Sequence, residues 1–291
     1  MNIFCIDIGG TNIKYTIFKN GVPSEIKSVA TPPYLKIEDM KKAIFPIIDE
    51  ALEKYTHLDF VSFSTCGQTR DNVVVYTSSK PGYIGCDWSK IIMERYNIPC
   101  VVNNDLHCAV MGEYHFGLDD NIPKPDNFTC LALGTGINIG VIIDKKLFAG
   151  DKNLSCYLDN VTDLDGNNQF KSASTASLLK LYTENSGKTV NGYEFITLLQ
   201  ANDECALRCY KKWITRVANI IKCVLYMYNI NTLAICGGIL NSDYPILEDI
   251  KDELPNVMPK PFYSDLIIYK SVLSSSQLYG AYAFALKKLN I

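Results

Sequence analysis

Two short turns rich in glycine and threonine are the features of this sequence that most directly suggest chemistry. A tight glycine turn between two apolar runs points consecutive backbone N–H groups into one concavity, which can hold an anion. The residues concerned are Gly9, Gly10 and Thr11 in the first turn, and Gly134, Thr135 and Gly136 in the second. A strand pattern follows each turn, whereas a helix follows a Walker A or Rossmann loop. The pair of turns therefore predicts a clamp for the phosphates of a nucleotide.

An acidic residue precedes only the first of these turns. Asp7 occupies the position at which the second half of the chain has Leu131. A carboxylate beside a triphosphate suits a Mg²⁺ ion, held through water. An exposed turn residue is the alternative, but an acid at the end of an apolar strand favours the functional interpretation. We therefore expect Asp7 to be the residue that faces the metal.

The two turns also form an internal repeat. GTNIKYTIFKNG, starting at Gly10, aligns with GTGINIGVIIDK, starting at Gly134, and strand patterns flank both turns. The offset of 124 residues (134 − 10) is close to the size of one domain. The repeat predicts two related halves, although two glycine hairpins can also resemble each other by chance.

Strand and helix patterns alternate along the whole chain, which predicts an α/β protein. Pro46 should kink or divide the first predicted helix. The predicted strands are 3–8, 13–18, 24–30, 60–65, 98–105, 128–133, 137–143 and 232–236, and the predicted helices are 37–55, 106–116, 172–185, 193–200, 204–230 and 276–289.

A loop rich in proline and aspartate, 118–127, separates the two halves of this pattern. We place the N-terminal lobe at 1–117 and the C-terminal lobe at 118–277. The C-terminal helix, about 278–291, is expected to pack back on the first lobe. A length of 291 residues suits two such domains.

Composition excludes several classes of protein. A net charge of −3 gives no electrostatic basis for nucleic-acid binding, and no apolar run is long enough to span a membrane. No signal peptide is recognisable, so we expect a cytoplasmic protein. The eleven cysteines include no CxxC pair and are odd in number, which favours reduced thiols over a disulfide framework.

Four motifs together resemble those of the ROK family of sugar kinases and related repressors. They are DIGGTNIK (7–14), NND (103–105) followed by AVMGE, LGTGI (133–137) and ICGGIL (235–240), in the order of the family. The resemblance implies two ribonuclease H-like (actin/hexokinase-like) domains around a central cleft. It also implies ATP and Mg²⁺ as cofactors, a small-molecule sugar as substrate, and a possible homodimer. Because the first motif begins at residue 7, we expect no helix-turn-helix domain of the kind found in ROK repressors.

The resemblance further implies roles for single residues. The two glycine–threonine turns fall on the family's phosphate motifs, the first of which also includes Asp7 and Lys14. Gly237 and Gly238 fall on its adenosine motif. Asp105 falls on the catalytic base, which accepts the proton of the sugar hydroxyl during phosphoryl transfer. Asn104, beside it, is expected to hydrogen-bond the sugar.

A loop that lines the sugar site in relatives is changed here. Ser64 and Gly67 fall on this loop, but Cys66 stands where the family has a proline. Where many ROK kinases have a Glu and a His that bind sugar, this chain has Tyr157 and Asn160.

A further sugar-binding glutamate of the family falls near Phe170. The aromatic side chains of Tyr157 and Phe170 could stack on a sugar or on the aglycone of a glycoside. The family's zinc motif is absent, so we expect no structural zinc.

Other candidates favour structural interpretations. His107 and His115 suit packing or surface positions better than a metal site, and the loop at 78–89 could either touch substrate or be purely structural. The sequence thus predicts ATP-dependent phosphorylation of a sugar hydroxyl. The alternative is a catalytically weak ROK-like protein that binds a sugar or nucleotide as a sensor.

Overall fold

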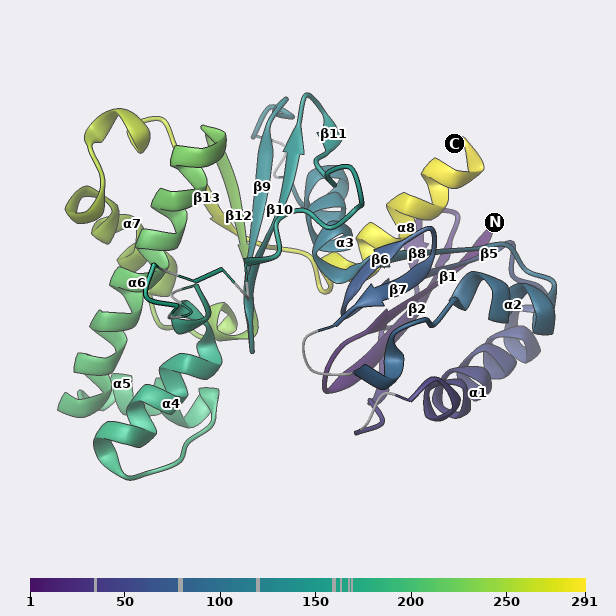
Figure 1. Cartoon of the computed structure of the whole chain (residues 1–291), viewed down its shortest axis with the longest axis horizontal. Coiled ribbons are helices and arrows are strands. Elements are labelled where there is room, and N and C mark those ends of the chain that lie inside the picture. The colour runs from purple at the N-terminus through teal and green to yellow at the C-terminus, as the bar shows by residue number, and fades with distance from the viewer. Residues whose placement is uncertain are drawn as a thin grey trace. The chain divides into compact units, whose positions relative to one another are not determined.

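The chain is an α/β protein with two compact units (Figure 1). The computed structural model describes residues 1–33, 36–77, 81–118, 121–158, 161–162, 164–166, 168 and 170–291. Unit 1 comprises Met1–Lys124, Leu147–Ser155 and Leu273–Ile291, and unit 2 comprises Pro125–Lys146 and Cys156–Val272. The lobe limits expected from the sequence, 117/118 and 277/278, stay a prediction.

Unit 1 is built on one mixed sheet with strand order β3-β2-β1-β5-β8, and β4 also pairs with β2. The strands are β1 (Asn2–Ile8), β2 (Asn12–Lys19), β3 (Val22–Pro23), β4 (Lys27–Ala30), β5 (Phe60–Thr65) and β8 (Cys100–Asn104). The hairpin β1–β2 is antiparallel, whereas β1–β5 and β5–β8 are parallel. A small hairpin joins β6 (Gln68–Arg70) to β7 (Val73–Tyr76).

The helices of unit 1 are α1 (Ile37–Tyr55), α2 (Trp88–Tyr96), α3 (Asp105–Gly112) and α8 (Ser276–Leu289). Single turns lie at Pro81–Tyr83 and, as a π-helix continuing α3, at Glu113–Gly117. Of the two outcomes expected at Pro46, a kink or a division, the division does not occur, because α1 runs unbroken from Ile37 to Tyr55. The ring of Pro46 lies on the exposed side, while Ile44 and Ile47 on either side of it are buried in the core of the unit. Burial of this apolar stripe outweighs the hydrogen bond that proline removes.

Unit 2 contains a five-stranded sheet with the order β11-β10-β9-β12-β13. The strands are β9 (Phe128–Leu133), β10 (Ile137–Ile143), β11 (Lys146–Leu147), β12 (Thr232–Cys236) and β13 (Ile267–Lys270), and the helices are α4 (Thr175–Ser186), α5 (Gly192–Gln200), α6 (Glu204–Tyr228) and α7 (Ile246–Val257). The amphipathic α6 buries Ile214, Val217 and Ile221 in the core, as its spacing predicts. Short 3₁₀ turns lie at Lys171–Ala173, Gly238–Asn241 and Lys260–Phe262.

The two sheets have the same topology, which confirms the repeat in the sequence. In each, an antiparallel hairpin (β1–β2 or β9–β10) is followed by a parallel neighbour (β5 or β12) and then by a second parallel strand (β8 or β13). Each glycine–threonine turn lies inside the hairpin of its own sheet. No helix or strand is predicted from the sequence over 241–275, where the structure has α7 and β13.

The C-terminal helix α8 packs closely on α3 and on the sheet of unit 1. A Cβ atom on Gly280 would lie 1.7 Å from the carbonyl oxygen of Cys108, and one on Gly112 would lie 2.1 Å from that of Ser276. The two backbones therefore touch where the helices cross. Ser62 Oγ donates to the Ala281 carbonyl at 2.6 Å, which ties α8 to β5.

The substitution Gly280→Ala should lower the free energy of unfolding by about 2 to 3 kcal/mol, because the added methyl forces α3 and α8 apart. Urea or thermal unfolding followed by circular dichroism measures this change. Gly192→Ala is the matched control, since a Cβ at this helical position meets nothing within 4 Å. Equal effects of the two substitutions would contradict the close crossing.

Candidate functional site

The carboxyl ends of three parallel strands of unit 1 lie in one row. Ile8 of β1 pairs with Thr65 of β5, and Thr65 pairs with Asn104 of β8. The loops that leave these strands therefore begin side by side at one edge of the sheet, the usual place for ligands in open α/β sheets. A hydrogen bond of 2.9 Å from the Cys66 N–H to the Ile8 carbonyl joins the first two loops.

Asp7 is a buried carboxylate one residue before the end of β1. Its side chain accepts a hydrogen bond of 2.6 Å from Ser64 Oγ, and Lys14 is its partner in register across the hairpin. Burial raises the pKa of Asp7 to about 6, and the Ser64 hydrogen bond and the charge of Lys14 offset part of this rise. A nearby cation would favour the ionised form.

The first glycine–threonine turn offers backbone donors to an anion. Within the turn, the Gly9 N–H donates to the Asn12 carbonyl at 3.0 Å. Thr31 stabilises the turn from outside: its N–H donates to the Thr11 carbonyl and its hydroxyl to the Gly9 carbonyl. Within the described parts of the chain, the amides of Gly10 and Thr11 donate to no acceptor. A Cβ on Gly10 would point into open space. These features fit the approach of a phosphate.

Asp105 is the first residue of α3 and is held by its neighbours. Asn104 Nδ2 donates to Asp105 Oδ1 at 2.9 Å and to the Gly67 carbonyl at 2.8 Å. The Asn104 side chain also caps α3 by accepting from the Leu106 N–H. The Asn104 amide thus orients Asp105 and the Gly67 loop. To bind sugar as the sequence predicts, Asn104 would have to replace one of these hydrogen bonds with a bond to the sugar.

Ser64 and Gly67 have clear structural roles in this arrangement. Ser64 is fully buried and directs its hydroxyl at Asp7. Gly67 has φ +98°, and a Cβ there would lie 2.8 Å from the Tyr76 carbonyl oxygen, so only glycine fits. Cys66, between Thr65 and Gly67, is a reduced, partly exposed thiol.

The second turn has a matching environment in unit 2. The Gly134 N–H closes it on the Gly136 carbonyl at 3.0 Å. The Thr175 N–H, in the first turn of α4, donates to the Gly134 carbonyl at 2.9 Å. The amides of Thr135 and Gly136 have no acceptor among the described residues. This hydrogen bond between Thr175 and the turn is not predicted from the sequence, because about forty residues separate its two partners.

Gly237 and Gly238 follow the end of β12, beside the end of β9. Cys236 pairs with Ala132 across these parallel strands. A Cβ on Gly237 would lie 2.1 Å from the Leu133 carbonyl oxygen, whereas one on Gly238 would meet nothing within 4 Å. Gly237 is therefore required by close backbone packing, and Gly238 leaves an open surface.

The changed sugar segment is only partly described. Tyr157 is half-buried in unit 2, and the neighbouring Leu158 N–H donates to Asn138 Oδ1 at 2.9 Å. Phe170 packs against the hydrophobic core of unit 2. Asn160 lies outside the described residues.

Two other candidates from the sequence have structural explanations. In the described part of the loop at 78–89, Tyr83 is buried and its hydroxyl contacts Thr65 and Trp88. His107 is buried, and neither ring nitrogen has a partner in the described structure. Residues 78–80 lie outside it.

The part of the chain that the structure describes contains neither a metal-binding cluster nor a membrane-spanning helix. No group of three or more histidine, cysteine, aspartate or glutamate side chains is arranged to hold a metal ion there. None of the helices in this part is long and apolar enough to cross a membrane.

Solved structures define the fold class. A ROK family glucokinase from Streptomyces griseus, in complex with glucose and AMPPNP, superposes with a TM-score of 0.85 at 19% identity, covering 99% of this chain and 100% of its own. A ROK family protein from Streptococcus pneumoniae, in complex with sucrose, has a TM-score of 0.83 at 22% identity, with 100% and 99% covered. The chain has the two-domain, ribonuclease H-like α/β fold of these proteins.

The family follows from the sequence match. The ROK family model matches residues 3–156 and 171–288, and this chain belongs to the ROK family. An uncharacterized protein of Clostridium perfringens is 26% identical over 97% of both chains. An N-acetylmannosamine kinase of Haemophilus influenzae is 21% identical over 88% of both. The xylose repressor of Bacillus subtilis is 24% identical over 64% of this chain and 49% of its own length.

The burial of Asp7 predicts a pH-dependent effect of Asp7→Asn. The pKa of the Asp7 carboxyl is raised from 3.8 to about 6 in the folded protein. The free energy of unfolding therefore falls as the pH rises through that interval, because the folded protein holds this proton more tightly than the unfolded chain. The shift corresponds to about 3 kcal/mol at pH 8, and asparagine removes the charge while keeping an acceptor for Ser64. In EDTA buffer the variant should therefore unfold at a higher temperature than wild type at pH 8. The two should be nearly equal at pH 4, and a less stable variant at pH 8 would contradict the prediction.

The burial of His107 predicts the opposite dependence of stability on pH. Burial lowers its pKa to about 4, so the folded state excludes a proton that the unfolded state binds below pH 6.5. The free energy of unfolding therefore decreases by up to about 3 kcal/mol as the pH falls from 6.5 to 4. His107→Leu should therefore gain stability relative to wild type between pH 7 and pH 4.5, measured as unfolding temperature. His57→Leu, at an exposed position, is the control and should show no comparable gain.

Proposed function

We propose that this protein is an ATP-dependent sugar kinase in which Asp105 is the general base. The observation that carries the proposal is the common edge of the sheet in unit 1. There the buried Asp7, the open backbone donors of the Gly10 turn and the fixed carboxylate of Asp105 leave neighbouring strands. The names of ROK relatives, among them kinases of N-acetylmannosamine and glucose, support the same reaction class.

Asp105 is suited to accept a proton from a hydroxyl. Phosphoryl transfer requires alignment and charge neutralisation more than covalent chemistry, together with one carboxylate that takes the acceptor's proton. The hydrogen bonds that Oδ1 accepts from Asn104 Nδ2 and from the Leu106 N–H fix the orientation of the carboxylate.

The turns fit the phosphates of a nucleotide. In our proposal the amides of Gly10 and Thr11 in unit 1, and of Thr135 and Gly136 in unit 2, donate to phosphate oxygens, and Lys14 adds a positive charge. Gly237 and Gly238 take the adenosine. Mg²⁺, when bound, would neutralise phosphate charge, and Asp7 is the carboxylate that would hold it through water.

We expect the substrate to be a sugar that fits a pocket different from that of many ROK kinases. Tyr157 and Asn160 stand in for the Glu and His of many ROK kinases, so we propose Ser64, Gly67, Asn104, Tyr157 and Asn160 as the residues nearest the sugar. A tyrosine offers a flat apolar face to a sugar ring or to an attached group. A panel of hexoses, N-acetylhexosamines and glycosides, assayed for ADP release, identifies the acceptor.

Asp105→Asn should lower kcat by about 10² to 10⁴-fold, because asparagine cannot accept the proton. The KM for ATP should change less than about threefold, since the phosphate turns are untouched. The variant keeps an oxygen for the Asn104 amide and should fold normally. If no sugar stimulates ATP turnover above the level of Asp105→Asn, the kinase assignment is wrong.

Gly10→Val tests the phosphate turn separately. Its side chain would enter open space, so the unfolding temperature should be unchanged, whereas phosphates approaching the turn would be displaced. We expect the KM for ATP to rise at least about tenfold, roughly 1.4 kcal/mol of lost binding. Gly192→Ala is again the silent control. An unchanged KM would remove this turn from the nucleotide site.

One outcome of these assays would support the sensor alternative. A chain that binds a sugar or a nucleotide by calorimetry, yet releases no ADP with any acceptor of the panel, would be a catalytically weak member. The family membership of the xylose repressor of Bacillus subtilis, a regulator by name, makes this outcome worth testing.

A further inference from the structure

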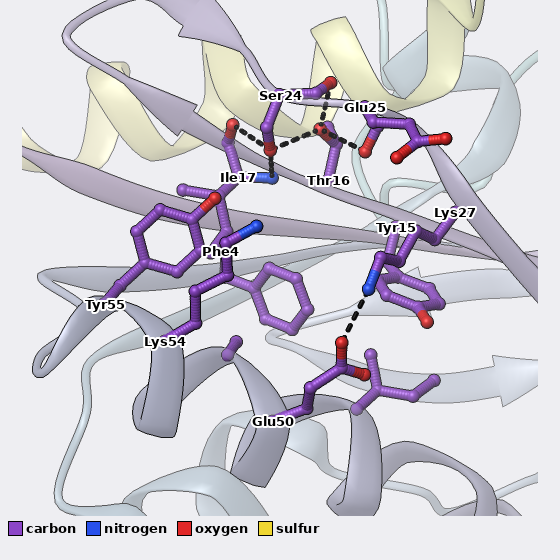
Figure 2. A pocket seen from close by; sticks show the side chains of 12 residues that line it. Phe4, Tyr15, Thr16, Ile17, Ser24, Glu25, Lys27, Glu50, Lys54 and Tyr55 are labelled. Atoms are coloured by element: carbon purple, nitrogen blue, oxygen red, sulfur yellow. Dashed lines mark hydrogen bonds and ion pairs between the residues drawn. The ribbon is translucent and has the colours of Figure 1, made fainter.

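Unit 1 contains a cavity that the proposed reaction does not use. It lies between α1 and the strands β1, β2 and β4, and its volume, including the open mouth, is about 440 Å³ (Figure 2). Its lining contains none of the proposed phosphate, metal or sugar residues.

The floor of the cavity is apolar and aromatic. Phe4, Ile17, Ile47 and Ala51 line it and are almost fully buried. The rings of Phe4 and Tyr15 meet edge to face, with centroids 6.0 Å apart and planes at 78°. A third ring could extend this arrangement, because perpendicular and offset aromatic contacts are favourable.

The mouth of the cavity is charged but balanced. Lys27 and Glu50 form an ion pair of 2.5 Å across it, and Glu25 and Lys54 line the same rim. Two positive and two negative side chains give no net attraction for an anion such as a nucleotide or a sugar phosphate. An uncharged occupant fits this rim best, since a charged one would have to leave water without compensation.

The walls supply hydroxyl groups for one polar substituent. Tyr15 and Tyr55 line the cavity, and their hydroxyls have no hydrogen-bond partner within the described chain. The hydroxyls of Thr16 and Ser24, by contrast, contact backbone atoms. Figure 2 shows the side chains of Tyr15 and Tyr55 on different sides of the Phe4 ring.

We propose that this cavity binds a small, uncharged, single-ring aromatic molecule that carries a hydroxyl group. The ring lies on Phe4 and Tyr15, and the hydroxyl bonds to a tyrosine of the wall. Tyr15 is adjacent in β2 to Lys14, the register partner of Asp7, so the occupant touches the strand that supports the phosphate turn.

The test uses the full-length chain without ATP or sugar, so its result is independent of kinase activity. Fluorine NMR measures binding of three probes at neutral pH: uncharged 4-fluorophenol, anionic 4-fluorobenzoate and cationic 4-fluorobenzylamine. We expect saturable binding of the phenol and at least about tenfold weaker binding of both ions. Equal binding of all three probes, or none of the phenol, would overturn the proposal.

Three variants and one control locate the site. Ala51→Leu fills the cavity and should weaken phenol binding at least about tenfold, while Lys42→Leu, on the same helix but outside the lining, should not. Tyr15→Phe and Tyr55→Phe each remove one hydroxyl group without adding volume. The variant that removes the hydroxyl bonded to the phenol should weaken phenol binding about fivefold. Binding that survives both Ala51→Leu and the two tyrosine variants would place the phenol elsewhere and refute the assignment.

Discussion

The alignment of three parallel strand ends in unit 1 is the constraint on which the candidate site depends. Ile8, Thr65 and Asn104 are held in one row by the backbone ladder of β1, β5 and β8. Side-chain and loop hydrogen bonds then fasten the segments beyond the row, from Ser64 to Asp7 and from Asn104 to the Gly67 carbonyl. Because the ladder fixes the strands, these few bonds are enough to bring Asp7 and Asp105 to one edge.

The burial that builds this edge also tunes its ionisable groups in opposite directions. Asp7 is driven towards its protonated form and His107 towards its neutral form, because both are removed from water without a counter-charge in direct contact. The C-terminal helix α8 packs on α3, the helix of His107, at a glycine contact. A metal ion beside Asp7 would recover part of the free energy that burying the carboxylate costs.

The second unit repeats the topology without repeating the chemistry. Its hairpin turn also has two amides that donate to no described acceptor. In the aligned repeat Leu131 stands at the position of Asp7 and Asn138 at that of Lys14, and the register partner of Leu131 is Ile139. Asn138 accepts a hydrogen bond from the Leu158 N–H and so has a structural contact instead. One fold has therefore been adapted twice, with a charged turn in unit 1 and an uncharged one in unit 2.

The sequence alone determined the fold class, the strand–turn–strand repeats and the residue types at the turns, because these depend on periodicity and on local backbone requirements. The limits predicted for β5, α1 and β9 coincide with those in the structure. Only the tertiary structure decided that Ser64 supports Asp7, that Asn104 orients Asp105, that Thr175 meets the Gly134 turn and that α1 continues through Pro46. These facts depend on contacts between distant segments, and pattern and propensity within one segment carry no information about such contacts.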